Sequence, residues 1–270
     1  MSGWRFTLVH APALRVDLRG VVPAALAALS RAEVERLPLG YGNAMLPLAE
    51  LFTVAPGDSD ALVFDADLAR VDRVGWQMAS GRIEVLGDVG DHAGGCMSGG
   101  TLIVRGHAGA LVACEMAGGS LTVDGNVGDF AASTLPGSID GMRGGCLVVK
   151  GDAGARFADR MRRGTAAVFG DAGDFLASRL VAGTIALGGK AGAHVGHGMR
   201  RGSVVFAAPT PCAIAPTFVP ALAEANVFWQ LLARDLAGLG GPFAELAGRR
   251  IERHLGDLAA AGKGELIFAA

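Results

Sequence analysis

The sequence predicts an all-β fold, a right-handed parallel β-helix solenoid of about seven 19-residue coils with mixed α/β terminal caps. Three columns of residues share a spacing of 19 with a single step of 26, which leaves room for an insertion. A fixed period shared by several columns is typical of stacked repeats. Two columns are glycine and one is large and apolar. They are Gly81, Gly100, Gly119, Gly145, Gly164, Gly183 and Gly202; Gly90, Gly109, Gly128, Gly154, Gly173 and Gly192; and Met97, Met116, Leu135, Met161, Leu180 and Met199.

Each repeat also contains a short run of alternating apolar residues. Ile83 and Val85 flank Glu84, and Leu121 and Val123 flank Thr122 in the same way. Alternation with a period of two predicts a strand with one buried face. A column of small residues predicts a second, shorter strand with a narrow interior. Its members are Val89, Ala108, Val127, Ala153, Ala172 and Ala191.

A repeat of 19 residues has no room for a strand, a helix and two loops, but it can hold three short strands with tight turns. Each coil would then pair in parallel with the next at a distance of about 4.8 Å. Right-handed winding is expected because parallel crossovers are overwhelmingly right-handed. The rival fold is the left-handed hexapeptide helix of acyltransferases and trimeric carbonic anhydrases. Its coil is a multiple of six, whereas 19 is not.

The two ends of the chain lack the repeat. We expect an N-terminal cap over 1–75, repeats over 76–206 with the insertion near 136–142, and a C-terminal cap over 207–270. Caps are needed because an open parallel edge invites aggregation.

Each cap contains one predicted helix. Ser30 and Glu33 form a capping box for a helix that ends near Leu37. A second helix is predicted over 221–236 from apolar residues at helical spacing. These residues are Leu222, Ala225, Trp229 and Leu232.

Composition excludes several classes of function. The net charge of −2 gives no reason to expect nucleic acid or an anionic membrane as a partner. The four cysteines contain no CxxC pair, which leaves a zinc or redox motif unsupported. The first 20 residues have no apolar signal segment, and no apolar run is long enough to span a bilayer. We therefore expect a cytoplasmic protein with reduced thiols.

Two columns of polar residues could in principle form a metal site or a catalytic site. His92 and His194 share one column, and His197 follows three residues after His194, but zinc would need a third ligand that is not evident nearby. A second column suggests a calcium ladder or paired catalytic carboxylates. We interpret it instead as turn residues bonded to nearby backbone. It comprises Asp88, His107, Asn126, Asp152 and Asp171. We predict no catalytic, cofactor-binding or metal-binding residue in this chain.

Arginines gather at the third turn of the repeat, beside the insertion. Several arginines one coil apart repel one another unless something anionic lies over them. Two interpretations stay open, a solvated corner with local Asp partners and a docking surface for an acidic partner or a polyanionic ligand. The candidate contact residues are Arg143, Arg160, Arg162, Arg163, Arg179, Arg200 and Arg201.

Both caps carry a family resemblance. Residues 37–54 read LPLGYGNAMLPLAELFTV, and residues 254–268 read HLGDLAAAGKGELIF. With GGTLIVRG and RRGTAAVFGDAG in the repeats, the chain resembles the C-terminal domain of glutamate synthase large subunits. It resembles still more closely the C subunit of formylmethanofuran dehydrogenase and of the bacterial formyltransferase/hydrolase complex.

This resemblance implies a non-catalytic subunit that scaffolds the catalytic subunits of a hetero-oligomer in tetrahydromethanopterin-linked one-carbon metabolism. The archaeal complex interconverts carbon dioxide and formylmethanofuran. The bacterial complex of methylotrophs, which serves formaldehyde oxidation, transfers a formyl group to a methanofuran analogue and hydrolyses it to formate. Of the 24 basic residues only three are lysine, which favours the bacterial version. Zinc and the methanofuran-type carrier would then belong to partner subunits, and the arginines would contact a partner or a polyglutamylated carrier tail.

Two other classes stay open. One is an amidotransferase accessory domain of the glutamate synthase type. The other is an enzyme with a site on a sheet face, like polysaccharide lyases. The outward strand positions are mostly apolar, so we expect them to be covered by protein, which makes a poor sugar groove. These positions are Glu84, Ile103, Thr122, Val148, Ala167, Ala186 and Val205.

Overall fold

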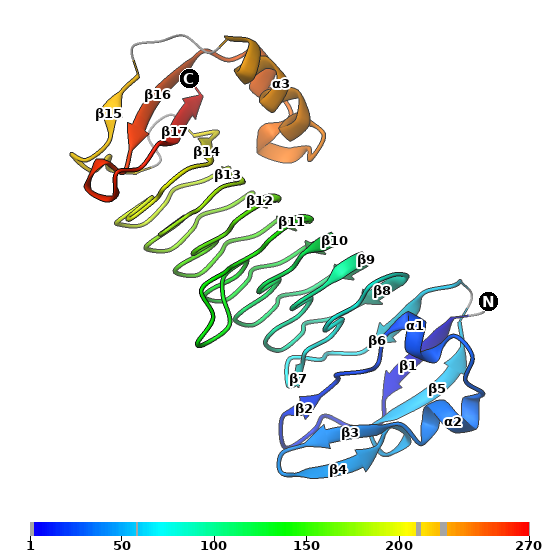
Figure 1. Ribbon diagram of the computed structural model, residues 1–270. Coiled ribbons are helices and arrows are strands. Elements are labelled where there is room, and N and C mark those ends of the chain that lie inside the picture. The colour runs from blue at the N-terminus through cyan, green and yellow to red at the C-terminus, as the bar shows by residue number, and fades with distance from the viewer. Residues whose placement is uncertain (1–2, 58, 209–211, 222–225, 270) are drawn as a thin grey trace.

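The computed structural model describes residues 3–57, 59–208, 212–221 and 226–269, which form two sheets and few helices. The larger sheet has 13 strands in the order β15-β16-β17-β14-β13-β12-β11-β10-β9-β8-β6-β1-β5. The smaller sheet has four strands in the order β4-β3-β2-β7. The strands of the repeats are stacked between an N-terminal part and a C-terminal part (Figure 1).

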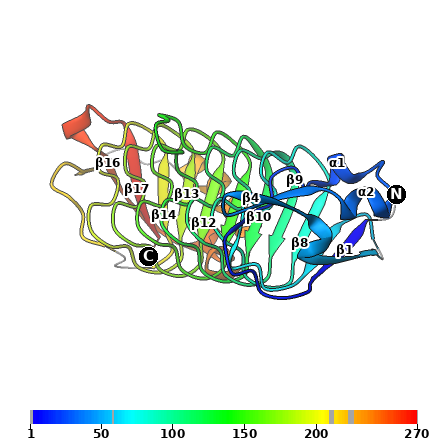
Figure 2. The ribbon, with the colours of Figure 1, turned by 90° about the horizontal axis from the view of Figure 1, so that it is seen from below.

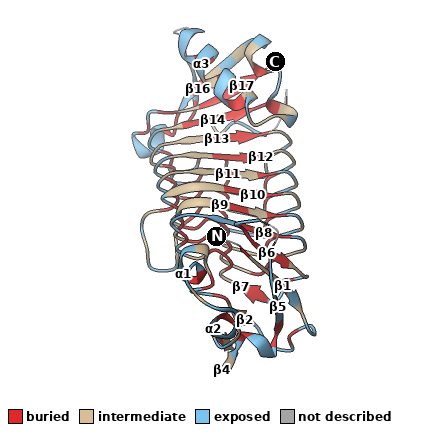
Figure 3. Cartoon of the chain, turned by 90° about the vertical axis from the view of Figure 1, so that its right-hand side faces the viewer, coloured by how far each residue is buried: buried red, intermediate tan, exposed pale blue. Residues whose placement is uncertain are grey.

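Parallel strands, one from each repeat and β6 from the N-terminal part, form the centre of the larger sheet. They are β6 (Leu62–Asp65), β8 (Arg82–Val85), β9 (Ser98–Val104), β10 (Gly118–Val123), β11 (Cys146–Val149), β12 (Thr165–Val168), β13 (Thr184–Leu187) and β14 (Ser203–Phe206). Equivalent residues pair, as Leu102 does with Leu121, so the strands lie in one row (Figure 2). The predicted alternation is confirmed in β8, where Ile83 and Val85 are buried and Glu84 between them is partly exposed, whereas all four residues of β14 are buried. Figure 3 shows the stacked strands coloured by burial.

The column of small residues pairs one residue at a time. Each member from Val89 to Ala172 forms a single parallel bridge to the next, and the series ends at Ala191. Between this bridge and the next strand lies a turn segment in which alternate residues take positive φ, such as His92 at 64° and Gly94 at 65°. Its backbone N–H groups donate to the neighbouring repeats on both sides, which stabilises this conformation.

The predicted fold class is therefore wrong. The structure is a mixed sheet, parallel in the centre but antiparallel where β1 (Trp4–Leu8) meets β5 (Phe52–Pro56) and where β16 (Ile251–Gly256) meets β17 (Gly264–Ala269). Each repeat supplies one strand and one bridge instead of three strands. The alternating positive φ values explain the difference, because such backbone cannot pair as a continuous strand.

The insertion also changes one member of the apolar column. We predicted Leu135 at this place, but Leu135 is half-buried and Met142 is buried instead. Met142 N donates to Ala132 O at 3.1 Å, as Met116 N donates to Ala113 O at 3.2 Å in the preceding repeat. The extra residues thus loop out before Met142, and the chain regains its register before β11.

The N-terminal part adds a small sheet and two short helices. Its remaining elements are β2 (Val16–Asp17), α1 (Pro23–Leu26), α2 (Arg31–Glu35), β3 (Pro38–Tyr41), β4 (Ala44–Pro47), η1 (Leu48–Glu50) and β7 (Val71–Asp72). The predicted capping box is confirmed, because Ser30 N donates to Glu33 Oε2 at 2.8 Å. Phe6 and Phe64 stack with ring centroids 4.8 Å apart and fill this end of the core.

The C-terminal part extends the larger sheet with three strands and covers one face of its last strands with α3. Its remaining elements are β15 (Val219–Pro220), α3 (Asn226–Ala237), η2 (Gly241–Phe243), η3 (Leu246–Gly248) and η4 (Leu258–Ala260). The second predicted helix is α3, and Leu222 and Ala225 lie outside the described residues. Within the described ranges, no helix combines the length and the hydropathy that a bilayer crossing requires.

A second core cluster lies under α3. Trp229 and Leu236 of α3 pack in it together with three outward sheet positions. These positions are Ala167, Ala186 and Val205, all of them buried. The cover that we expected over this face therefore comes, at these positions, from the chain itself.

Candidate functional site: an arginine groove

The side chains in the polar column of Asp88 accept hydrogen bonds from the backbone, as predicted. The backbone groups that donate to them belong to the next repeat and not to the same turn. Asp88 Oδ1 accepts a hydrogen bond from His107 N at 2.7 Å, and Asp152 Oδ1 accepts one from Asp171 N at 2.8 Å. His107 Nδ1 and the amide oxygen of Asn126 accept equivalent bonds. These acceptors tie successive repeats together, which explains the residue types without invoking calcium or acid–base catalysis.

The histidines pack against aromatic rings. His194 stacks on Phe175 with ring centroids 4.7 Å apart, and His197 meets the same ring edge-on. Burial lowers the pKa of His92, and the nearby Arg73 lowers it further. In the part of the chain that the structure describes, no three His, Cys, Asp or Glu side chains are grouped to hold a metal ion.

All seven predicted arginines line two adjoining hollows, which we call the arginine groove. The larger hollow has a volume of about 630 Å³ and the smaller one about 460 Å³. Arg162, Arg200, Val181 and Ala260 line both of them. Arg143, Arg163 and Arg201 line the larger hollow, and Arg160 and Arg179 the smaller one.

The repeat itself brings these arginines together. They lie in the segments that lead into β11, β12, β13 and β14, and parallel pairing in register places equivalent positions one above another. Neighbouring strands in a sheet are about 4.8 Å apart, so arginines one or two repeats apart share one surface.

Sequence reasoning missed several residues that line the groove, among them Ile139, Asp140 and Lys263. Ile139 and Asp140 come from the insertion, whose position beside the arginines was the available signal. Lys263 lies outside the repeats, and no periodic signal points to it. It joins the groove because β17 pairs in parallel with β14 and Lys263 N donates to Arg200 O at 2.7 Å.

Some of these cations have a carboxylate partner and others do not. Arg162 Nε lies 2.5 Å from Asp140 Oδ1, and Arg143 Nη2 lies 3.6 Å from Glu115 Oε2. Among the described residues, no ion pair joins a carboxylate to the remaining cations of the larger hollow. These cations are Arg163, Arg200, Arg201 and Lys263. The solvated-corner interpretation with local Asp partners thus describes only part of the groove.

A buried carboxylate holds Arg179, one of the arginines that line the smaller hollow. The side chain of Asp159 is 3% exposed and accepts from Arg179 Nη2 at 2.7 Å and from Arg179 Nε at 3.0 Å. Ser178 Oγ also donates to it. Two parallel hydrogen bonds fix the plane of the Arg179 guanidinium, so this contact orients Arg179. Ser178 is itself buried, so its hydroxyl serves the fold here.

Two curated proteins match part of the chain, and no protein-family model matches it. The Fhc C subunit of the formyltransferase/hydrolase complex of Methylorubrum extorquens is 43% identical over 76 residues, 28% of this chain and 29% of that protein. The C subunit of the tungsten-containing formylmethanofuran dehydrogenase 2 of Methanothermobacter marburgensis is 30% identical over 99 residues, 35% of this chain and 37% of that protein. The matched segments thus span about a third of each curated relative.

A solved structure matches almost the whole chain. It is the crystal structure of the formyltransferase/hydrolase complex (FhcABCD) from Methylorubrum extorquens in complex with methylofuran. The match has a TM-score of 0.91 and 40% sequence identity, and it covers 98% of this chain and 99% of that chain. Fold and sequence therefore agree over nearly the full length of the two chains.

Proposed function

Since this chain belongs to the family of the C subunits of formyltransferase/hydrolase complexes and formylmethanofuran dehydrogenases, we propose that it is the structural subunit of such a complex. The match over nearly the whole length to a chain of a formyltransferase/hydrolase complex carries this proposal. The described side chains support it as well, because the ladder carboxylates and Asp159 are engaged in holding the fold. Membership of this family also favours a structural subunit of such a complex over an amidotransferase accessory domain.

In this proposal the chemistry belongs to the other subunits. The complex transfers a formyl group from tetrahydromethanopterin to a methanofuran-type carrier and hydrolyses it to formate, within cytoplasmic one-carbon metabolism. The carrier and the zinc centre lie on partner chains. The methylofuran in the related complex supports the carrier assignment.

The chain divides into three parts with different tasks in this scaffold. The repeats over 76–206 form a rigid body, and the caps over 1–75 and 207–270 close its two ends. The antiparallel strands at both ends of the larger sheet support this division. The arginine groove is the contact surface for a partner protein of the complex or for the acidic tail of the carrier.

Co-expression of the chain with the other subunits tests this role. Charge reversal of four groove arginines should weaken co-purification or carrier binding, because every one of them lines the larger hollow. The four substitutions are Arg162→Glu, Arg163→Glu, Arg200→Glu and Arg201→Glu. Recovery of the wild-type chain as a monomer with its own hydrolase activity would contradict the scaffold role. Normal assembly and turnover of the quadruple variant would contradict only the role of the groove.

A further inference from the structure

We propose that the arginine groove binds an acidic segment of a partner polypeptide that also carries apolar side chains, and that this segment displaces Asp140. The inference rests on the proposed function and specifies the chemistry of the partner. It is carried by three features of the groove, namely its unpaired cations, its resident carboxylate and its apolar rim.

The first feature is an excess of positive charge on one surface. The larger hollow is lined by six cationic side chains and by Asp140 as the one described carboxylate. Three of the cations, Arg143, Arg162 and Arg200, occupy equivalent positions of repeats that are one or two apart, so their like charges are held on one surface by the fold. The whole chain has a net charge of −2, so this surface stands out from the rest of the molecule. Such a surface attracts a ligand with several carboxylates, which guanidinium groups bind in a bidentate manner.

The second feature is that Asp140 already occupies part of the groove. It belongs to the insertion, and its Oδ1 lies 2.5 Å from Arg162 Nε. Both side chains are partly exposed, and exposed ion pairs are exchanged at little cost. Up to Asp140 the bonds of the insertion are local, from Ser138 N to Leu135 O and from Asp140 N to Ser138 Oγ, and the next residue, Gly141, is tied to the following repeat through Arg160 O. Asp140 thus mimics one carboxylate of the incoming segment and can give up its place to it.

The third feature separates a polypeptide from a bare polyanion. Ile139 is 68% exposed and lines the smaller hollow beside Arg160 and Arg179. The η4 turn contributes Ala260 to the groove and presents Leu258 with 53% exposure. Large apolar side chains exposed beside a charged groove are typical of protein–protein contacts. A ligand that carries only carboxylates would leave them in water.

Two synthetic peptides of equal charge test this inference on the purified full-length chain. One reads Asp-Leu-Asp-Asp-Leu-Asp and the other has Ser in place of each Leu. By calorimetry at low salt, both should bind, and the leucine peptide should bind about tenfold more tightly, since burying part of one Leu is worth about 1.4 kcal/mol. Asp140→Asn should tighten the binding of both peptides several-fold.

Two further variants separate charge from apolar contact. Ile139→Ser should abolish the advantage of the leucine peptide and leave binding of the serine peptide unchanged. Arg163→Glu with Arg201→Glu should abolish binding of both peptides, whereas the matched charge change Arg31→Glu with Arg36→Glu on the exposed surface of the N-terminal part should have no effect.

Equal affinity for the two peptides would overturn the inference in favour of a site for a bare polyanion such as a carrier tail. Weaker binding to the Asp140→Asn variant would show that this carboxylate belongs to the site rather than competing for it. If neither peptide binds while the complex still assembles from wild-type subunits, the inference fails and the proposed function stands.

Discussion

Single residues in this protein are constrained mainly by the neighbouring repeats in the stack. The carboxylate of Asp152 reaches into the next repeat to accept the N–H of Asp171, and it needs space there. A Cβ atom at Gly170 would lie 2.1 Å from Asp152 Oδ1, and one at Gly109 would lie 2.2 Å from Asp91 Oδ1. At both positions, glycine therefore leaves room for a carboxylate that accepts a backbone N–H of the next repeat.

Replacing Gly170 by Ala tests this explanation. The added methyl group must push Asp152 away from the N–H of Asp171, and we expect a loss of about 1–3 kcal/mol in the free energy of unfolding. Urea denaturation measures it. Gly248→Ala is the matched control, because nothing lies within 4 Å of a Cβ atom there and its φ is not positive. Equal stability of the two variants would show that the Asp152 carboxylate does not require a glycine at position 170.

Asp257 provides a test that depends on pH. Burial opposes ionisation, but the N–H of Gly198, the hydroxyl of Thr217 and the N–H of Ala259 donate to the carboxylate and hold its pKa below the usual range. A depressed pKa in the folded state means that the stabilisation is complete above the unfolded pKa of about 3.9 and is lost as the pH falls through the folded value.

We therefore expect Asp257→Ala to lower the free energy of unfolding by about 1–3 kcal/mol at neutral pH, and by progressively less below about pH 4. Urea titrations over a pH series give the difference between the variant and the wild type. Asp235→Ala, on the exposed side of α3, should change stability little at any pH. A difference for Asp257→Ala that does not vary with pH would rule out the charged form as the source.

At the scale of elements, α3 divides the outward face of the sheet into a covered and an uncovered part. Ala186 is buried beneath α3, while Thr122 occupies the equivalent position farther along the sheet and is partly exposed. The same repeat position therefore has different requirements, because the covering helix contacts only the last strands.

Introducing a carboxylate at both positions should reveal this division. Ala186→Glu buries an unpaired charge under α3, and we expect a loss of about 3–5 kcal/mol or separation of α3 from the sheet. Thr122→Glu should stay within about 0.5 kcal/mol of the wild type. Hydrogen exchange of the α3 amides measures the effect. Unchanged protection of α3 in Ala186→Glu would show that the helix does not depend on this contact.

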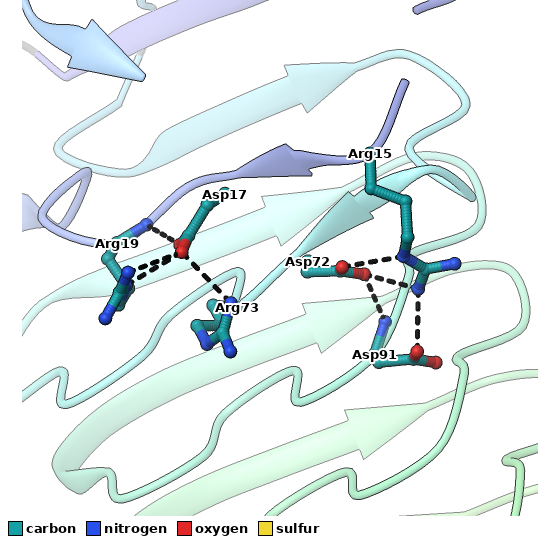
Figure 4. Close-up of polar contacts among 6 residues, drawn as sticks. All are labelled: Arg15, Asp17, Arg19, Asp72, Arg73 and Asp91. Carbon is teal, nitrogen blue, oxygen red and sulfur yellow. Dashed lines mark hydrogen bonds and ion pairs between the residues drawn. The ribbon is translucent and has the colours of Figure 1, made fainter. Parts of the chain in front are cut away.

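At the scale of the whole molecule, an ion-pair network joins the small N-terminal sheet to the first repeat. Asp72 accepts two hydrogen bonds from Arg15, at 2.6 and 2.7 Å, and one from Asp91 N at 2.8 Å (Figure 4). Arg15 also lies 2.7 Å from the Asp91 carboxylate, and the hydrogen bonds to Asp72 raise the pKa of Arg15. Asp17 holds Arg19 and Arg73 in a similar arrangement.

Asp72→Ala should therefore loosen the small sheet without unfolding the repeats. We expect a loss of about 1–3 kcal/mol, because the N–H of Asp91 and the Arg15 guanidinium lose their acceptor. Hydrogen exchange should become faster in β2 and β3 and stay unchanged in β10 to β13. Arg19→Ala, which removes an exposed partner, should cost at most about 1 kcal/mol. Equal acceleration in both sheets would instead indicate one cooperative unit.

In the arginine groove, the residues from the repeats could be predicted from the sequence and Lys263 could not. The spacing of 19 residues brought Arg162, Arg163, Arg200 and Arg201 together, because equivalent positions of paired parallel strands must share a surface. Lys263 could not be found in this way. It is placed by the pairing of β17 with β14, between segments 62 residues apart that have no common period.

Periodicity in the sequence was enough to establish which residues pair in register, which face of each strand points into the core between the repeats and where the arginines gather. It suffices for these features because each repeat packs against a near copy of itself. Three others emerged only from the folded chain, namely that the sheet is mixed rather than a parallel solenoid, that Met142 replaces Leu135, and that α3 covers Ala186. These features depend on contacts between the repeats and segments outside them, where no repeated neighbour constrains the choice.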